Sequence, residues 1–276
     1  MALKELGILM VATNSYLERW KDTVLSLEKT SLYDVSTQIH LFTNRSEEAL
    51  SWSRKNLKRI NVKAYPISGW GWPEATLLRY EFFHKNLSQI SESVLMYLDS
   101  DMEIRSDFSK LLEPQQWING LAFVQHPGFS LPNGLTRLKY LILNPRKMIS
   151  CFLSLVKNGN ALGSWETRQI SNAYVPRKMR RKYVHGAIWF GKNEEFKRLC
   201  TQLSHRTRED LTKGVIAIWH DESHLNWFLA THHATVLDNR FSGVDGYKNL
   251  SSLYSCIVTV EKSSSEGRQP TEEGIR

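Results

Sequence analysis

The sequence predicts an α/β fold built as layers around one or more sheets of short strands. Runs of apolar and β-branched residues alternate with segments of helical periodicity along most of the chain. A hydrophobic fraction of 41% over 276 residues is enough to bury a substantial core. No internal repeat interrupts this pattern, and the length alone is compatible with one large domain or two small ones.

Seven short apolar runs are candidate strands, at 6–13, 39–43, 61–67, 93–98, 121–126, 184–191 and 234–238. The first run offers only about eight apolar residues before Thr13 and Asn14, without a small-residue cleavage site. It is too short to cross a bilayer, so we expect a core strand and neither a signal peptide nor a membrane anchor. The protein is therefore expected to be cytoplasmic, or to be the catalytic part of something longer.

Five segments have helical periodicity, at 16–29, 47–59, 74–90, 193–213 and 221–232. In the third of these, apolar residues recur about one turn apart, at Leu77, Leu78, Phe82 and Leu87. That spacing predicts an amphipathic helix. The polar segment 263–276 is expected to be a mobile tail unless a ligand orders it.

The segment 130–163 departs from the alternating pattern. It combines Leu- and Ile-rich runs with five cations, Arg137, Lys139, Arg146, Lys147 and Lys157. Pro145 divides it into two candidate amphipathic helices. Two interpretations stay open: a helical subdomain packed on the body, or a peripheral contact with a membrane. At an anionic surface each Lys or Arg contributes about 1 kcal/mol.

The net charge of +8 suits a phosphate-bearing ligand, an anionic membrane or a nucleic acid, but it equally suits a merely soluble basic surface. Nucleic-acid binding is disfavoured because no aromatic-interleaved RNA motif or helix-turn-helix pattern accompanies the charge. Three cysteines, Cys151, Cys200 and Cys256, form an odd set without CxxC spacing. They predict reduced thiols that serve in packing.

Two carboxylates follow a strand in the segment SVLMYLDSDMEI. Asp99 and Asp101 are alternate residues, so on an extended chain both would point to one site at the carboxyl end of the strand. Ligands of α/β proteins usually bind at that edge. Paired carboxylates there can hold Mn²⁺ or Mg²⁺, which in turn bridges a diphosphate. By itself an acidic pair at this spacing is also compatible with a solvated turn.

The segment IAIWHDESHLNWF, at 216–228, is the richest in chemistry. It gathers Trp219, His220, Asp221, Glu222, His224 and Asn226 where an apolar, strand-like run meets a helix. An indole can pack on the apolar face of a pyranose while neighbouring polar groups bind its hydroxyls. The acids alone could simply favour the helix dipole.

A zinc hydrolase is the rival interpretation, because His220 and His224 have the spacing of H-E-x-x-H. Here the glutamate stands one place too late for the usual general base. The spacing to His232 or His233 as a third ligand also matches no metzincin pattern. We therefore reject it.

Taken together, these segments resemble family 6 glycosyltransferases, which include the histo-blood-group A and B enzymes, α-1,3-galactosyltransferase and bacterial relatives. The resemblance is a series of segments in the family's order over most of residues 6–268. WHDESHLN is its most specific element. DSDMEI, TLLRYEFF, HPGF, SWETR, SNAYVP and HGAIWFG accompany it.

The resemblance implies a GT-A-type fold with a mixed, mostly parallel central sheet flanked by helices. One catalytic domain would span 1–262, with a basic apolar insertion at about 130–163, and the tail 263–276 would close over the donor. The implied enzyme is a retaining α-1,3-glycosyltransferase that moves galactose or N-acetylgalactosamine from the UDP-sugar to a galactoside-type oligosaccharide or glycolipid. Because both acids of DSD are present, dependence on Mn²⁺, or alternatively Mg²⁺, is expected.

The resemblance also implies roles for individual residues. Glu222 would act on the anomeric carbon, as a nucleophile or by stabilising an oxocarbenium-like ion, with Arg79 and Asp221 beside it. A same-face route in which the leaving phosphate activates the acceptor also stays open. Asp99 and Asp101 would bind the metal, and the donor would contact Val11, Ala12, Thr13, Tyr16, Asp99, Ser100, Asp101, His185, Ala187, Lys262 and Arg268. The acceptor would contact His126, Ser164, Trp219 and Glu222.

Three features depart from the family pattern or refine it. Ala187, in place of glycine, leaves less room for an N-acetyl group and favours galactose. The segment 130–163 is longer than in mammalian members, so the acceptor's identity does not carry over. PRKMRRKY, at 176–183, is unusually basic: it is either flexible surface or a site for an anionic lipid carrier. A binding protein that keeps the pocket without the chemistry is disfavoured, because Asp99, Asp101 and Glu222 are all present.

Overall fold

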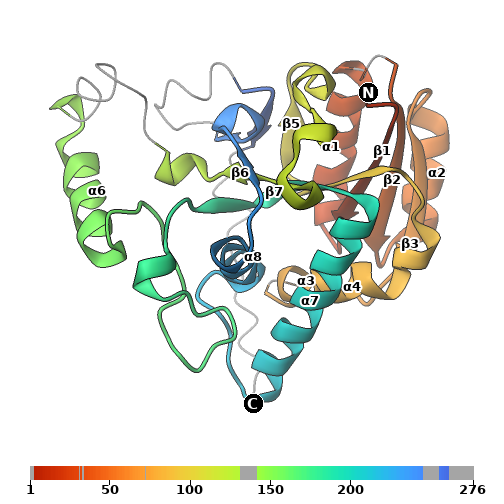
Figure 1. The fold of residues 1–276 in the computed structure, drawn as a ribbon. Helices are drawn as coiled ribbons and strands as arrows, with labels where there is room; N and C mark the ends of the chain where they lie inside the picture. The colour runs from red at the N-terminus through yellow and green to blue at the C-terminus, as the bar shows by residue number, and fades with distance from the viewer. Residues whose placement is uncertain are drawn as a thin grey trace.

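The computed structural model describes residues 3–30, 32, 34–71, 73–130, 142–244 and 255–260. Within this part of the chain a seven-stranded sheet has the order β3-β2-β1-β4-β7-β6-β8 (Figure 1). Its strands are β1 (Glu5–Val11), β2 (Ser36–Thr43), β3 (Asn61–Pro66), β4 (Val94–Leu98), β6 (Leu121–Gln125), β7 (Val184–Lys192) and β8 (Thr235–Leu237). A second, three-stranded sheet joins β5 (Met102–Ile104), β10 (Ile257–Thr259) and β9 (Gly243–Val244), in that order.

The large sheet is mixed and mostly parallel. β1 pairs in parallel with β2 and β4, β2 with β3, and β6 with β8. Only β7 runs the other way, antiparallel to both β4 and β6. The α/β class and the GT-A-like arrangement expected from the resemblance are thereby confirmed. The reversal brings the start of β7 to the edge where β1 and β4 end.

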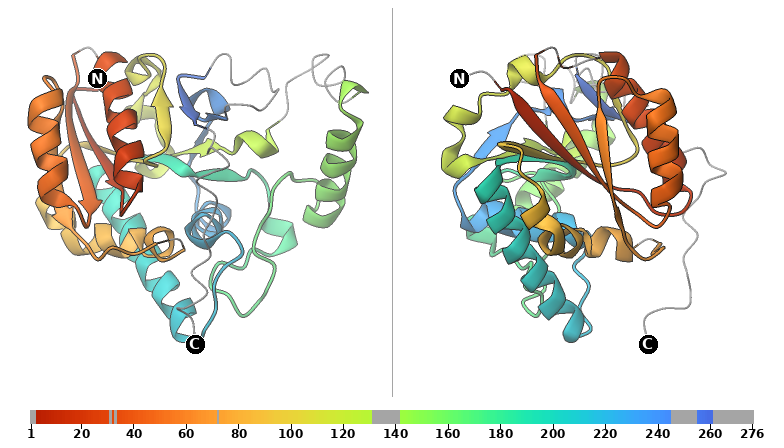
Figure 2. Two further views of the ribbon diagram at one scale, coloured as in Figure 1. Left: turned by 180° about the vertical axis from the view of Figure 1, so that it is seen from behind. Right: turned by 90° about the vertical axis from the view of Figure 1, so that its right-hand side faces the viewer.

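Helices cover both faces of the sheet (Figure 2). α1 (Tyr16–Thr30) and α2 (Ser46–Asn56) pack on the face that carries Met96 of β4. α4 (Arg79–Asn86), α7 (Asn193–Thr212) and α8 (His220–Thr231) pack on the face that carries Tyr97. Alternate residues of a strand point to opposite faces, so the entirely apolar run VLMYL supplies both cores at once.

The predicted helix at 74–90 is wrong as a single element. It breaks at Leu78 (φ −97°, ψ 6°) into α3 (Glu74–Leu77) and α4, and a 3₁₀ turn (Leu87–Gln89) follows. On both sides of the break apolar residues are buried, Leu77 in α3 and Tyr80 in α4. It also directs the side chain of Arg79 inward, where only 5% of the residue stays exposed.

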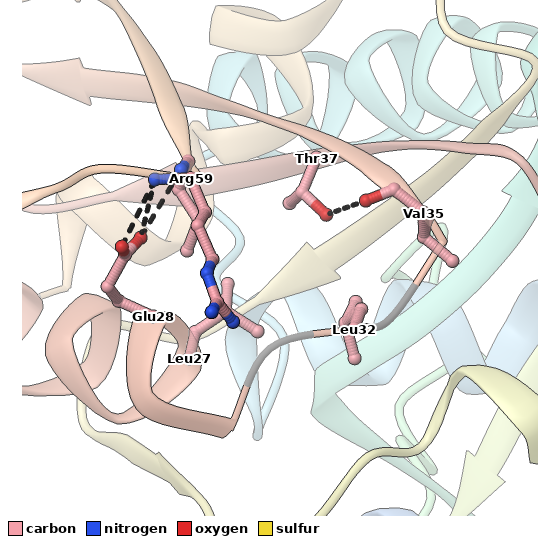
Figure 3. Close-up of a pocket in the computed structure, with 7 residues that line it drawn as sticks. Leu27, Glu28, Leu32, Val35, Thr37 and Arg59 are labelled. Atoms are coloured by element: carbon pink, nitrogen blue, oxygen red, sulfur yellow. Dashed lines mark hydrogen bonds between the residues drawn. The ribbon is translucent and has the colours of Figure 1, made fainter.

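The helix predicted at 47–59 ends early, at Asn56, for a reason visible in Figure 3. The Glu28 carboxylate accepts the backbone N–H groups of Lys58 (2.9 Å), Arg59 (3.1 Å) and Ile60 (3.2 Å). A side chain thus takes the amides that a longer helix would have used internally. Leu27, Glu28, Leu32, Val35, Thr37, Arg59 and Ile60 line a small pocket beside this contact.

The remaining predicted strands and helices are present with small shifts at their ends, apart from two. The apolar run before α8 is an irregular turn and not a strand, because the Ile218 N–H bonds the Glu166 carboxylate (2.9 Å) and not a neighbouring strand. Of the two helices predicted in 130–163, α6 (Pro145–Asn158) is present, and residues 131–141 lie outside the described part. The three cysteines are free and buried, as expected. None of the helices in the described ranges is long and apolar enough to cross a membrane.

Candidate active site

The candidate site lies at the carboxyl ends of β1 and β4, where the start of β7 meets the first turn of α8. The register pairs Leu9 with Tyr97, so Val11 stands level with Asp99. On the other side of β4, the Asp99 N–H donates to the carbonyl of Ala187 (2.9 Å). Residues predicted to bind nucleotide, metal and donor sugar are therefore neighbours on adjacent strands.

Arg79 links two acidic residues at the centre of the site. Its Nη1 lies 3.3 Å from Asp99 Oδ1, and its Nε lies 3.3 Å from Asp221 Oδ2. Nη1 also donates to the Gly186 carbonyl (3.2 Å), and the guanidinium stacks 4.4 Å from the centre of the Tyr97 ring. Burial lowers the pKa of Arg79, but Asp221, Tyr97 and Asp99 outweigh that effect, so the net shift is upward. A fixed positive charge is thereby buried in the site.

The two acids of α8 have strongly perturbed protonation. Burial raises the pKa of Asp221 to about 7, which the Asp99 and Glu222 carboxylates reinforce and Arg79 opposes. Burial likewise raises the pKa of Glu222 to about 7, although a hydrogen bond from Gly186 favours its charged form. Among the described residues Asp221 Oδ2 accepts no hydrogen bond, although it forms an ion pair with Arg79. A buried acceptor of this kind can accept a hydrogen bond from a hydroxyl.

Glu222 is held by both carboxylate oxygens. The hydroxyl of Tyr183 donates to Oε1 (2.7 Å) and the N–H of Gly186 donates to Oε2 (2.8 Å). Gly186 is required by the closeness of the two elements, because an added Cβ would lie 2.9 Å from the Glu222 Cβ. These contacts fix the carboxylate at the start of β7, between the predicted donor and acceptor residues.

Asn226 ties α8 to β7. Its side-chain amide accepts from the N–H of Val184 (2.8 Å) and donates to the Val184 carbonyl (2.9 Å) and to the Glu222 carbonyl (2.9 Å). It acts as a substitute strand partner on the β4 side of β7, because the pairing of β4 with β7 ends at Leu98 and Ile188. One turn of α8 is thus locked in register against β7, and Glu222 with it.

The acidic pair stands on a turn, so the prediction that an extended chain aligns the two carboxylates is wrong. Ser100 and Asp101 form a turn between β4 and β5. The turn is held by Thr23, whose hydroxyl donates to the Ser100 carbonyl (2.9 Å) and accepts the Met102 N–H (3.2 Å). Both aspartates keep partial exposure, Asp99 at 30% of its side chain. The hydroxyl of Tyr97 donates to Asp99 Oδ1.

The residues predicted for the donor sugar and the acceptor meet at Glu222. The rings of His126 and His185 are 4.6 Å apart, and His185 Nδ1 pairs with the hydroxyl of Ser242 (2.6 Å). Burial, reinforced by the nearby His126 and Arg79, places the pKa of His185 well below its usual value, so its ring is neutral at neutral pH. Nitrogen and oxygen atoms of His126, His185 and Glu222 lie within 4.8 Å of one another, close enough to share a metal ion.

A second acceptor-side contact joins the Trp219 indole to Ser164, whose hydroxyl accepts its N–H (2.7 Å). Trp219 is 46% exposed, so a face of its ring is open to a ligand. Behind it, buried Glu166 accepts from the Arg168 side chain (2.6 Å) and from the Ile218 N–H (2.9 Å). Burial alone would raise the pKa of Glu166, but these hydrogen bonds outweigh it and lower the pKa to about 2.

The predicted uridine residues border the end of β1. Thr13 is buried and donates to the Trp70 carbonyl (2.6 Å), which draws the loop after β3 over the strand end. Ala12 is buried, Val11 is partly exposed and Tyr16 is 36% exposed. Lys262 and Arg268 lie outside the described residues.

Two other features are separate from this site. The pocket of Figure 3 lies at the opposite edge of the sheet, where β2 and β3 begin, and its roughly 40 Å³ suits a few waters and not a nucleotide. His224 of the rejected zinc motif is buried against Asp210 (3.6 Å), and burial lowers its pKa to about 3. Neither it nor His220 belongs to a three-ligand cluster among the described residues.

Comparison with known proteins agrees with this geometry. The sequence model of glycosyltransferase family 6 matches residues 156–253, which include β7, α8, Asp221 and Glu222. The chain is 25% identical to the O-antigen biosynthesis glycosyltransferase WbnI of Escherichia coli over 248 residues, 88% of this chain and 89% of that protein. The chain is thus similar to glycosyltransferase family 6, most specifically over residues 156–253.

Shorter matches of higher identity relate the chain to mammalian proteins. It is 38% identical over 72 residues to the histo-blood group ABO system transferases 1 and 2 of Rattus norvegicus. Those matches cover 26% of this chain and 21% and 22% of the two rat proteins.

Sequence analysis found the segments of the site but missed several of its positioning residues. Tyr183, Gly186, Glu166 and Asn226 all lie inside or beside segments that it singled out. Gly186 carried a signal, since a glycine within a strand often marks a close approach. The roles of the other three depend on distant partners, which no local pattern reveals.

Proposed function

We propose that this chain is a metal-dependent, retaining hexosyltransferase that moves galactose, or alternatively N-acetylgalactosamine, from its UDP-sugar in α-1,3 linkage to a galactoside-type acceptor. The main support is the placement of Glu222. Its carboxylate is fixed by Tyr183 and Gly186, and one of its oxygens lies within 4.8 Å of ring nitrogens of His126 and His185. A carboxylate so placed can meet positive charge at an anomeric carbon.

Asp221 and Arg79 would position the donor. The unbonded Oδ2 of Asp221 would accept a sugar hydroxyl, which compensates for its burial. Arg79 would keep Asp221 and Asp99 close together and add positive charge near the diphosphate. The orientation of the donor is thus assigned to a buried ion-pair network and not to surface side chains.

Asp99 and Asp101 would hold the metal. Partly exposed carboxylates on a turn fixed by Thr23 are the hard oxygen donors that Mn²⁺ and Mg²⁺ prefer. Bound there, the metal would supply Lewis-acid stabilisation of the departing diphosphate. The His126, His185 and Glu222 cluster is assigned to the sugars, because His185 is predicted to contact the donor sugar and His126 the acceptor.

Ala187 supports galactose as the donor sugar. The residue is 5% exposed, and its carbonyl accepts the Asp99 N–H. Its methyl group is therefore fixed close to the turn that carries the two aspartates. A buried methyl reduces the room for an N-acetyl substituent, whereas the hydrogen atom of a glycine would not.

The test is release of UDP from UDP-galactose, UDP-GalNAc, UDP-glucose and UDP-GlcNAc with Mn²⁺, with and without a β-galactoside acceptor. We expect release from a galactose-type donor, abolished by EDTA and reduced at least a hundredfold in Glu222→Gln. Thr231→Ala, an exposed change on the same helix, is the matched control. Absence of release from every donor, together with absence of UDP-sugar binding by calorimetry when metal is present, would refute the proposal.

A further inference from the structure

Helix α6 presents an apolar stripe to solvent. At 100° per residue, Met148, Ile149, Phe152, Leu153 and Val156 fall within an arc of roughly 140°. Each of these side chains is exposed, from 46% for Met148 to 65% for Phe152. The opposite side of the helix carries the residues that face the protein, among them buried Cys151 and Asn158.

α6 lies at the periphery of the molecule in both front and rear views (Figures 1 and 2). Its attachment is at its C-terminal end, where the buried Arg180 side chain donates to Asn158 Oδ1 (2.9 Å) and Arg177 donates to the Val156 carbonyl (2.7 Å). Ser154 and Asn158 also bond the Gly163 carbonyl (3.3 and 2.9 Å). The helix is thus fixed to the basic segment 177–182, and its stripe stays open.

The charge around the stripe has one sign. Residues 114–192 contain twelve Lys and Arg and a single acid, Glu166, which is buried and paired with Arg168. Exposed Arg146 and Lys157 fall beside the stripe on the helical projection. At the C-terminal end of α6, exposed Lys178, Arg181 and Lys182 extend the same basic surface.

We propose that α6 and segment 177–182 form a docking surface for an anionic lipid bilayer. An apolar stripe bordered by cations is the pattern of a helix that lies in the interface, with its apolar side chains among the acyl chains and its cations at the headgroups. A protein partner would need acidic groups arranged around an apolar groove that fits the helix. An anionic bilayer supplies negative charge at its headgroups and an apolar interior, and neither requires a matching shape.

Docking would bring the acceptor side of the site toward the membrane. Gly163, bonded to α6, is followed by Ser164, which holds the Trp219 indole. An acceptor carried on a lipid would then reach Trp219 from the surface to which the enzyme is bound. This last consequence rests on the proposed function, whereas docking itself does not.

Co-sedimentation of the full chain with vesicles tests the docking, with no nucleotide sugar present. We expect binding to phosphatidylcholine vesicles containing phosphatidylglycerol, at least tenfold weaker binding to phosphatidylcholine alone, and loss of binding at high salt. Ile149→Glu with Phe152→Glu should lower the partition coefficient at least tenfold, and Lys178→Glu with Arg181→Glu should lower it on anionic vesicles only. Ile118→Glu, which adds a charge at an exposed apolar residue of another element, should bind like the wild type.

Wild-type protein that ignores anionic vesicles, or a stripe variant that binds them as well as wild type does, would overturn the proposal. So would sedimentation velocity showing a dimer that the stripe variant dissolves without any vesicle binding, since the stripe would then face a second copy. Release of UDP with a soluble acceptor should be unchanged in the stripe variant. Failure of that activity in the wild type would count against the proposed function alone.

Discussion

At the scale of single residues, the site depends on two neighbouring carboxyl groups that share one buried environment. Asp221 and Glu222 both have a pKa of about 7, compared with ordinary values of 3.8 and 4.5. Their titrations are coupled through proximity, so a measured midpoint belongs to the pair. At neutral pH the pair is partly protonated, and the proposed chemistry needs Glu222 ionised.

The first prediction concerns pH and activity. kcat/KM should rise with pH through an apparent midpoint near 7 as the pair loses its protons, because that ratio reports the free enzyme. Asp221→Asn removes one neighbouring charge and should shift the midpoint downward. A profile that is flat between pH 5 and 8 would contradict the assignment of Glu222.

The same shifts predict a stability change of definite sign. Between about pH 4 and 7 the folded protein holds protons that the unfolded chain has released, so its free energy of unfolding should fall as the pH rises through this range. In Glu222→Gln the free energy of unfolding should fall less over the same pH range, by on the order of 2 kcal/mol. Denaturant unfolding at pH 5 and pH 8 measures it, with Glu209→Gln as the exposed control. Equal pH dependence in variant and wild type would exclude the shift.

A third prediction at this scale concerns donor choice. Ala187→Gly removes a buried methyl group from the position assigned to the donor sugar. The ratio of kcat/KM for UDP-GalNAc to that for UDP-galactose should increase about tenfold, a typical effect of one methylene in a pocket. Competition assays with both donors measure the ratio. An unchanged ratio would place the sugar elsewhere.

At the scale of elements, the site depends on how α8 is joined to β7. Neither element alone brings the side chains of the site together. The two are connected through Asn226, and through the hydrogen bond of Gly186 with the Glu222 carboxylate. Asn226 satisfies both backbone groups of Val184 and also bonds the Glu222 carbonyl. The buried amide therefore positions Glu222 without touching a substrate.

Asn226→Ala should leave the N–H and carbonyl of Val184 without partners, at a cost of about 2 to 4 kcal/mol in the free energy of unfolding. Thermal denaturation should show the loss, and Thr231→Ala on the exposed part of α8 should show little change. In the variant kcat should fall more than KM rises, because the carboxylate is displaced while the pocket persists. A purely structural role would lower the melting temperature and leave kcat per folded molecule intact.

At the scale of the whole molecule, the two sides of the large sheet serve different purposes. β1 and β4 end at the predicted nucleotide and metal positions, whereas α8 contributes Asp221 and Glu222 beside the start of β7. Arg79 connects the two sides through Asp99 and Asp221. A ligand that spans them should therefore stabilise the complete fold.

The corresponding prediction is that UDP and Mn²⁺ together raise the melting temperature more than the sum of their separate effects. At a hundred times the dissociation constant the gain is about 2.7 kcal/mol. Asp101→Asn should abolish the synergy while leaving the melting temperature of the unliganded protein nearly unchanged. If UDP alone gives the full shift, metal dependence is wrong.

Sequence patterns predict the α/β class, most element positions and the resemblance to family 6, because apolar periodicity and a distinctive string such as WHDESHLN are local properties. They could not determine that 74–90 breaks at Leu78, since the break serves the burial of Arg79 between distant carboxylates. Nor could they place the acidic pair on a turn fixed by Thr23, or join Glu222 to Tyr183 and Gly186. Those facts arise from long-range packing, in which burial and charge balance decide a side chain's partners and its pKa.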